Sequence, residues 1–275
     1  MVVQHNLTAA NTNRQLGITT NGLQKSTEKL SSGYKINRAA DDAAGLSISE
    51  KMRNQIRGLN KASDNAQDGI SLVQTAEGAL NEVHSMLQRM SELAVQAANG
   101  TNATTDRTAL NDEVQQLKTE IQRVGSTTQF NKMNILDGGF SAGTKKALQV
   151  GANANQTISI AISALKSVVG SSLIGALKIG TATNAQSAIT TVQSSIEKLS
   201  TLRSKLGAVQ NRLEHTVANL DNISENTQSA ESRIRDTDMA EEMVQYSKNN
   251  ILQQAGQSML AQANQANQGV LSLLQ

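Results

Sequence analysis

A run of apolar and small residues at alternating four- and three-residue steps restricts the fold of this chain more than any other feature. It extends from Met52 to Ala97 and slips once, where two steps of three meet around Val73. Such a repeat places one apolar stripe along a helix that packs against partner helices, as in a coiled coil. Because the chain contains no proline, the pattern predicts one helix from about Ala44 to Asn99. That helix is roughly 84 Å long at 1.5 Å per residue.

Two further segments repeat the same pattern. A second helix is predicted over 104–124, with Asp106 in its first turn and Gly125 at its end. A third is predicted over about 184–233, with an apolar seam from Ile189 to Ile223, and it can run antiparallel to the first. The residues that we assign to the seam of the bundle are Leu80, Val83, Leu87, Leu206, Val209 and Leu213.

The segment between the second and third helices has a different texture, because seven of the 19 glycines lie between Gly138 and Gly180. Apolar and polar residues alternate over 148–150 and 158–162, which is typical of a half-buried strand. We predict a small β-hairpin within about 136–162, followed by a loosely specified stretch to Gly180. The fold class is therefore mainly α, a long antiparallel coiled-coil helical bundle rod with a small β-hairpin patch.

The two terminal segments, to about Ser32 and from about Ala240, consist mostly of Ala, Gln, Asn, Leu and Ser. Such segments are either disordered tails or interaction segments that fold only when many copies pack together. The C-terminal segment carries a helical stripe of Leu252, Ala255, Met259, Leu260, Ala263 and Val270.

The composition excludes several classes of function. Without cysteine there is no disulfide, thiolate zinc site or thiol nucleophile. Two tyrosines, two phenylalanines, no tryptophan and a net charge of +2 argue against a binder of nucleic acid or of an anionic membrane. No run of about 18 apolar residues predicts a membrane-spanning helix, and no secretory signal pattern is present. Taken alone, these absences favour a cytoplasmic protein.

A search for catalytic motifs is also negative. The sequence has no HExxH, P-loop, GxGxxG or GxSxG motif, and its histidines, His5, His84 and His215, are scattered. The carboxylates between Asp236 and Glu242 follow Arg233 and Arg235 closely, which favours a solvated charged face over a metal or acid–base site. We expect no enzyme activity, no cofactor and no metal.

Several long motifs closely resemble the bacterial flagellin family. The segment KLSSGYKINRAADDAAGLSISEKMRNQIRGL (29–59) resembles the N-terminal signature of the family, and the similarity continues over 65–80 and 87–101. At the other end, 206–220, 230–244 and 249–275 resemble its C-terminal block. The resemblance covers about the first 160 and the last 90 residues.

The resemblance implies a structural subunit that polymerises into the flagellar filament for swimming motility. It implies a core domain D0 (1–43 and 235–275), a domain D1 (44–234) and no substantial outer variable domain. It also implies unfolded export by the flagellar type III apparatus to the cell exterior, which replaces the cytoplasmic expectation. The implied partners are other copies of the chain, an export chaperone that binds the C-terminal stripe, and the hook-associated junction and cap proteins. A hook–filament junction protein remains as an alternative.

A further implication is recognition by the vertebrate Toll-like receptor for flagellin. The run QRMSELAV (88–95) is similar to the family's receptor-binding motif, so Gln88, Arg89 and Leu93 carry over, together with Glu113 on the next helix. This assignment expects Leu93 to be exposed; the alternative is that Leu93 packs inside the bundle. Ser91 departs from the usual arginine, which removes one charge contact.

Overall fold

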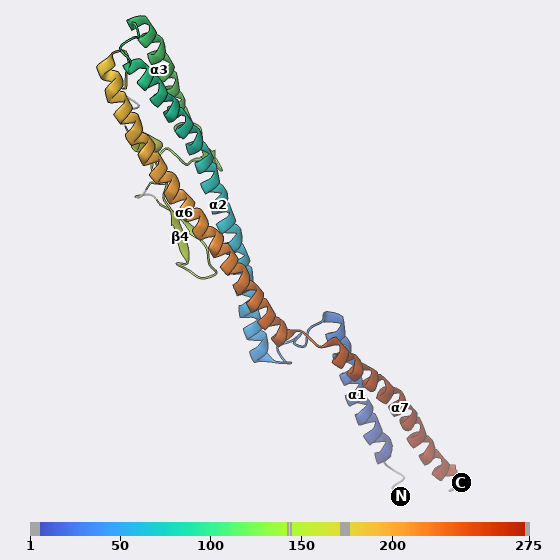
Figure 1. Ribbon diagram of the computed structural model, residues 1–275. Helices are drawn as coiled ribbons and strands as arrows, with labels where there is room; N and C mark the ends of the chain where they lie inside the picture. Colours follow the sequence, from blue (N-terminus) through green and yellow to red (C-terminus); the bar gives the residue numbers. More distant parts are fainter. Residues whose placement is uncertain (1–5, 142, 144, 171–176, 273–275) are drawn as a thin grey trace. The chain divides into compact units, whose positions relative to one another are not determined.

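The computed structural model describes residues 6–141, 143, 145–170 and 177–272. The chain divides into two compact units, of which unit 1 consists of residues 1–55 and 225–275 and unit 2 of residues 56–224. Unit 1 thus brings together two segments from opposite ends of the chain, whereas unit 2 is one continuous segment (Figure 1).

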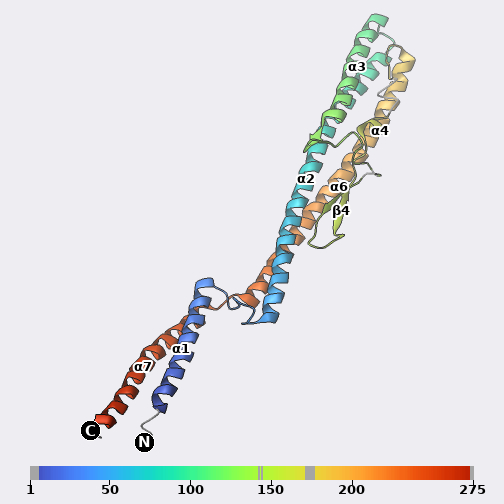
Figure 2. The same ribbon diagram turned by 180° about the vertical axis from the view of Figure 1, so that it is seen from behind.

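In unit 2 the helices α2 (Ala43–Ala98), α3 (Thr104–Thr127) and α6 (Ala182–Arg235) run side by side, as the opposite views in Figures 1 and 2 show. The side-chain contacts make α2 and α6 antiparallel. Ser63 donates a hydrogen bond of 3.1 Å to Asp221, and further along α2, Glu77 lies 3.6 Å from Arg203. The predicted long antiparallel helices are confirmed, with ends within two residues of the predicted ones.

The core of unit 2 follows the heptad seam. On α2, Leu80, Val83 and Leu87 are fully buried, and on α6, Leu206 and Leu213 are buried while Val209 is half-buried. One continuous cluster of buried apolar side chains connects these two helices with α3 and with the segments that cover them. Burial of a leucine of this kind stabilises a fold by roughly 1.5–3 kcal/mol.

One seam residue is wrongly predicted at the end of α6. Ile223 is 37% exposed, whereas the neighbouring Ser224 is buried and donates a 2.7 Å hydrogen bond to Asn60 on α2. After Leu220 the seam takes a step of four to this serine rather than a step of three to the isoleucine. A search for apolar residues misses such a position, because here a polar pair fills the seam.

The end of α3 also differs from the prediction, since the helix continues through Gly125 to Thr127. The Ser126 and Thr127 hydroxyls donate to the carbonyl of Arg123 and so satisfy a carbonyl of the last turn. Gly125 does not end the helix. It lets the Leu165 side chain pack close to the backbone of α3, because a Cβ at this position would lie 3.2 Å from Leu165. At the other end of α3, Asp106 accepts a hydrogen bond from the Ala103 N–H, as expected of a residue that caps the first turn.

The predicted hairpin is present as β3 (Lys146–Gln149) and β4 (Thr157–Ile160), an antiparallel pair in which Lys146 faces Ile160 and Gln149 faces Thr157. Ile158 and Ile160 are buried, whereas Thr157 and Ser159, the alternate residues of β4, are exposed. The alternating apolar residues of the sequence are therefore those on the side of β4 that packs into the core of unit 2.

Two small elements were not predicted. The strands β1 (Gln129–Phe130) and β2 (Met133–Asn134) form a tight hairpin through Asn131 and Lys132, both at positive φ. The short helix α4 (Leu165–Val169) buries Leu165, Val168 and Val169 in the core, so this part of the supposedly loose stretch is well packed. Residues 171–176 of that stretch lie outside the described residues.

In unit 1, helix α1 (Leu7–Ser32) packs along α7 (Met239–Ser272). Helix α1 ends at Gly33, whose φ of 74° is the left-handed conformation that glycine adopts readily at a helix end. Among the described residues, no helix is long and apolar enough to cross a membrane.

The turn before α2 is held by two aspartates. Asp41 accepts hydrogen bonds from the N–H groups of Asn37 and Arg38, and these bonds lower the pKa of its carboxyl, that from Arg38 having the larger effect. Asp42 accepts from the N–H of Gly45 in the first turn of α2. The pair explains locally why the long helix begins at residue 43.

Candidate functional surfaces

The interface between the terminal helices is polar and closely packed. Half-buried residues of α7 recur at steps of four and three, at Glu242, Tyr246, Asn249, Gln253, Gly256, Leu260 and Ala263, and Asn250 is half-buried beside this row. Most of them are polar or small, so their burial contributes little hydrophobic free energy. The pair is held by close approach and hydrogen bonds rather than by a large apolar seam.

Polar contacts at both ends set the antiparallel register of this pair. Near the N-terminal end of α7, the Lys29 ammonium lies 3.3 Å from the Glu242 carboxylate. Near its other end, the side-chain amide of Asn6 donates a 3.1 Å hydrogen bond to the carbonyl of Ala263. A slip of the register would therefore break contacts at both ends.

Two glycines let the helices approach each other between these contacts. A Cβ at Gly22 would lie 3.3 Å from the Asn249 amide nitrogen, and a Cβ at Gly256 would lie 3.2 Å from a methyl group of Leu16. Larger side chains at either glycine would push the helices apart.

Another side of α7 exposes several large apolar side chains. Val244 and Ile251 are each 67% exposed, Met259 is 58% exposed and Leu252 is 46% exposed. At about 100° per residue these side chains fall on one side of the helix, together with exposed Ala255. Exposed Lys248 lies among them, and large apolar side chains that gather on one exposed side of a helix indicate an interaction site.

The predicted C-terminal stripe is divided between these two faces. Leu252, Ala255 and Met259 belong to the exposed flank, whereas Leu260 and Ala263 are half-buried on the face toward α1. The side chain of Val270 lies outside the described residues. On α1, Leu7 and Ile18 are also exposed, at 72% and 59%.

Unit 1 also contains a cluster of charged groups around one aromatic ring. The guanidinium carbon of Arg235 lies 4.7 Å from the centre of the Tyr34 ring and that of Arg53 lies 5.6 Å from it, and Arg53 donates a 3.2 Å hydrogen bond to the Tyr34 hydroxyl. Arg235 also donates to Glu50 at 3.1 Å. Glu231 is 9% exposed, accepts a 3.0 Å hydrogen bond from Ser49 and lies 3.7 Å from Arg53.

Sequence reasoning missed this cluster, because its members are far apart in the chain and follow no motif spacing. Backbone bonds close it: Lys35 N–H donates to the Arg235 carbonyl at 2.7 Å, and Thr237 N–H donates to the Gly33 carbonyl at 3.0 Å. The segment after α1 and the segment before α7 are thereby joined.

In unit 2, Arg89 organises a small charged patch. It donates to Glu113 on α3 at 2.9 Å and to Glu92 on its own helix at 3.1 Å. These hydrogen bonds, chiefly that with Glu113, raise the pKa of the Arg89 guanidinium. Gln88 is exposed beside it, and its amide lies 3.2 Å from the His84 ring.

The expectation that Leu93 is exposed is wrong. Its side chain is 1% exposed and belongs to the core cluster of unit 2. The seam residues Met90 and Ala97 are buried on either side, and Leu93 lies one helical turn from each, on the same face of α2. The exposed apolar residue of this run is Val95, at 56%.

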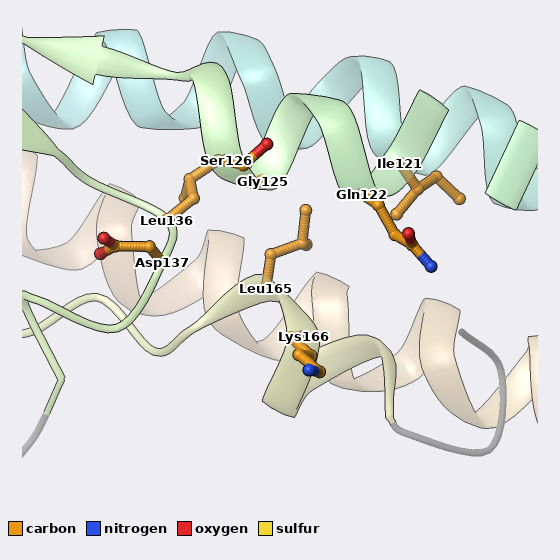
Figure 3. Close-up of a pocket in the computed structure, with 8 residues that line it drawn as sticks. All are labelled: Ile121, Gln122, Gly125, Ser126, Leu136, Asp137, Leu165 and Lys166. Atoms are coloured by element: carbon orange, nitrogen blue, oxygen red, sulfur yellow. The ribbon is translucent and has the colours of Figure 1, made fainter. Parts of the chain in front are cut away.

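A pocket of about 410 Å³ lies between α3, α4 and the loop at residue 136 (Figure 3). Ile121, Leu136 and Leu165 give it an apolar wall, and Asp137 and Lys166 are its charged residues. Ser126 reaches the lining from α3, but its hydroxyl donates to the backbone carbonyl of Arg123. The lining thus provides no base beside the hydroxyl and no set of metal ligands.

The acidic run before and within the start of α7 has structural partners. Asp238 accepts hydrogen bonds from the N–H groups of Ala240 and Glu241, and Glu242 pairs with Lys29. Within the described part of the chain, no three His, Cys, Asp or Glu side chains gather in a way that could hold a metal ion.

Comparisons with known proteins agree with this arrangement. The profile of the bacterial flagellin N-terminal helical region matches residues 3–141, and that of the C-terminal helical region matches residues 189–274. A flagellin of Halalkalibacterium halodurans is 57% identical over the whole length of both chains. The flagellar filament 31.3 kDa core protein of Treponema maltophilum is 49% identical, again over all of both chains.

A solved structure is also similar. The crystal structure of Bacillus cereus flagellin superposes with a TM-score of 0.51 at 33% sequence identity, covering 57% of this chain and 88% of that one. The two family profiles match the terminal segments as well as the helical bundle. The sequence similarity therefore includes both units.

Proposed function

This chain belongs to the bacterial flagellin family and is a structural subunit of the extracellular flagellar filament, and from that premise we propose that the exposed flank of α7 is its principal assembly surface. The observation that carries this proposal is the row of Val244, Ile251, Leu252 and Met259, all exposed on one flank while polar residues occupy the packed face. Copies of the same chain are the partners that cover this row in a homopolymer.

A pair of point variants tests the assembly surface. Leu252→Asp places a carboxylate in the exposed row, so the monomer should fold and fail to polymerise. Ala261→Asp introduces the same group at an exposed position that is not three or four residues from any member of the row, and this variant should polymerise. Circular dichroism of the monomers measures whether each variant folds, and electron microscopy after seeding shows whether it polymerises. Normal filaments from Leu252→Asp would contradict the proposal.

Removal of 240–275 extends the test. We expect a soluble protein that retains unit 2 and does not polymerise, because α1 then has no helix to pair with. An export chaperone that binds the C-terminal stripe of Leu252, Ala255, Met259, Leu260, Ala263 and Val270 should lose its affinity for this truncation. Unchanged capture by the chaperone would place its site elsewhere.

We further propose that the chain is exported unfolded by the flagellar type III apparatus. The absence of proline and cysteine supports this, because no prolyl isomerisation or disulfide exchange delays refolding. The terminal pair, with its polar interface, should open easily in the free monomer and close in the filament. Hydrogen exchange that is faster in 7–32 and 239–272 of the monomer than of the filament is the expected result.

For the domains, we propose D0 as 1–43 with 235–275 and D1 as 44–234. The compact units divide at other places, because unit 1 also includes residues 44–55 of α2 and residues 225–234 of α6. The hook-associated junction and cap proteins are proposed as partners at the filament ends. The alternative of a junction protein is disfavoured, because the full-length relatives named above are flagellins or filament core proteins.

The immune-recognition proposal now rests on Gln88, Arg89 and Glu113. Arg89 and Glu113 are paired, partly exposed, and come from two helices, which gives a receptor a rigid charged surface. Leu93 no longer contributes, because it is buried. Val95, at 56% exposure, is an exposed large apolar residue on the same helix as Arg89.

A further inference from the structure

The turn that joins α2 to α3 contains the dipeptide Asn99-Gly100, and its geometry differs from that of the other Asn-Gly pair in the chain. Asn99 and Gly100 are both exposed and lie just beyond the end of α2 at Ala98. A Cβ built on Gly100 would meet no atom within 4 Å outside its two chain neighbours, so there is open space beside this residue. The assembly function described above makes no use of this turn.

We propose that Asn99 is a site of spontaneous deamidation. The nitrogen of Gly100 attacks the side-chain carbonyl carbon of Asn99, and a new N–Cγ bond closes a five-membered succinimide ring. The Cγ–Nδ2 bond breaks, and ammonia leaves with the proton that the Gly100 nitrogen gives up. Water then adds to either ring carbonyl and opens the ring to aspartate or to isoaspartate, so the balance is water in and ammonia out with no redox change.

The surroundings of Asn99 favour this reaction. Thr101 N–H donates a 3.3 Å hydrogen bond to Asn99 Oδ1, the oxygen on which negative charge develops during the attack. A backbone donor at that oxygen stabilises the developing charge in the same way as an oxyanion hole. Gly100 has no side chain to hinder the approach of its own nitrogen.

The second Asn-Gly pair, Asn21-Gly22, provides an internal control. It lies inside α1, where the helical backbone keeps the glycine nitrogen bonded to a carbonyl and away from the preceding side chain. Gly22 also packs against Asn249 on α7. Reaction at Asn21 requires the helix to open first, which Asn99 in its turn does not require.

Conversion at Asn99 also has a structural consequence. The Arg107 guanidinium donates to the carbonyls of Ala97 and Asn99 at 3.0 and 2.9 Å, and Asn102 N–H donates to the Asn99 carbonyl at 3.4 Å. Aspartate adds a carboxylate beside this arginine, whereas isoaspartate lengthens the main chain and displaces the carbonyl that both donors use.

The experiment is timed incubation of assembled filaments in neutral and mildly alkaline buffer, followed by tryptic digestion and mass spectrometry. Asn99 is read in the peptide from Met90 to Arg107 and Asn21 in the peptide from Gln15 to Lys25. We expect the mass change of amide-to-acid conversion at Asn99, with split elution from the two products. Conversion at Asn21 in filaments should be slower by about tenfold or more. A factor of ten corresponds to a free energy of ~1.4 kcal/mol for the local opening of α1 that the reaction requires.

Gly100→Ala should slow the conversion at Asn99 strongly, because a methyl group then stands beside the attacking nitrogen. No conversion at Asn99, equal rates at Asn21 and Asn99 in filaments, or an unchanged rate in Gly100→Ala would each overturn the proposal. Asn99→Asp filaments supply the reference elution position of the aspartyl product.

Discussion

The guanidinium of Arg235 stacks on the ring of Tyr34, 201 positions away in the chain, with its central carbon 4.7 Å from the ring centre. The Arg235 carbonyl accepts a hydrogen bond from Lys35, the residue that follows this tyrosine. Side-chain stacking and backbone bonding therefore join the same two segments. The contact joins the segment that follows α1 to the segment that leads into α7.

Replacement of Tyr34 should weaken unit 1 in graded steps. Tyr34→Ala removes the ring that both guanidiniums contact and should lower the free energy of unfolding by about 1–2 kcal/mol. Tyr34→Phe keeps the ring but loses the hydrogen bond from Arg53, so it should lower the free energy of unfolding by about 1 kcal/mol or less. Lys35→Ala, at an exposed neighbour, is the control. Urea unfolding of monomers measures the series, and equal losses for the alanine and phenylalanine variants would remove the stacking argument.

A charge in the bundle seam should prevent folding of unit 2 and therefore assembly. Leu206 is 1% exposed, so Leu206→Asp buries an unpaired carboxylate at a cost of about 3 kcal/mol or more and should abolish filaments. Ser204→Asp places the same group on the exposed face of α6 and should leave swimming intact. Normal motility of the Leu206→Asp strain would show that this seam is misplaced.

Receptor binding should depend on Arg89. Arg89→Ala removes the side chain that joins Glu113 to Glu92 and should weaken binding of the monomer about tenfold, or ~1.4 kcal/mol. Arg123→Ala is the matched control, because Arg123 is also an exposed arginine paired with a glutamate three residues earlier. Surface plasmon resonance with the receptor ectodomain measures the affinity of each variant, and only Arg89→Ala should bind more weakly than the wild type. Identical affinities for wild type and Arg89→Ala would refute the assignment.

The stability of unit 2 should rise with pH in the alkaline range through Lys118. This lysine is 6% exposed, and burial, followed by repulsion from Lys178, lowers the pKa of its ammonium below the ordinary value of 10.5. Between the lowered pKa and 10.5 the unfolded chain binds more protons than the folded one, so the free energy of unfolding increases with pH.

Lys118→Met removes that contribution. The difference in unfolding free energy between wild type and this variant should shift in favour of wild type as the pH approaches 10.5, as measured by urea unfolding at several pH values. The variant also leaves the carbonyl of Leu177 without the ammonium as donor, which affects all pH values alike. A difference that stays constant with pH would count against the lowered pKa.

The sequence alone was sufficient for the long helices, because the information for them is local. Most turns of α2 and α6 repeat the four- and three-residue apolar steps, and no proline interrupts either helix. A helix with one continuous apolar stripe has to bury it, so an antiparallel bundle follows from the period itself. The β3–β4 hairpin was predictable for the same reason, since alternation and turn residues are also local signals.

What only the tertiary structure decided depends on neighbours that are distant in the chain. Leu93 has the same residue type whether it faces solvent or core, and it is buried because the residues on its side of α2 face the bundle. Ser224 replaces Ile223 in the seam because Asn60 is opposite to accept its hydrogen bond. The cluster around Tyr34 forms because chain segments near residues 34, 50 and 235 meet. Periodicity determines which face of a helix is apolar, but the partner across the interface determines which individual side chains that interface covers.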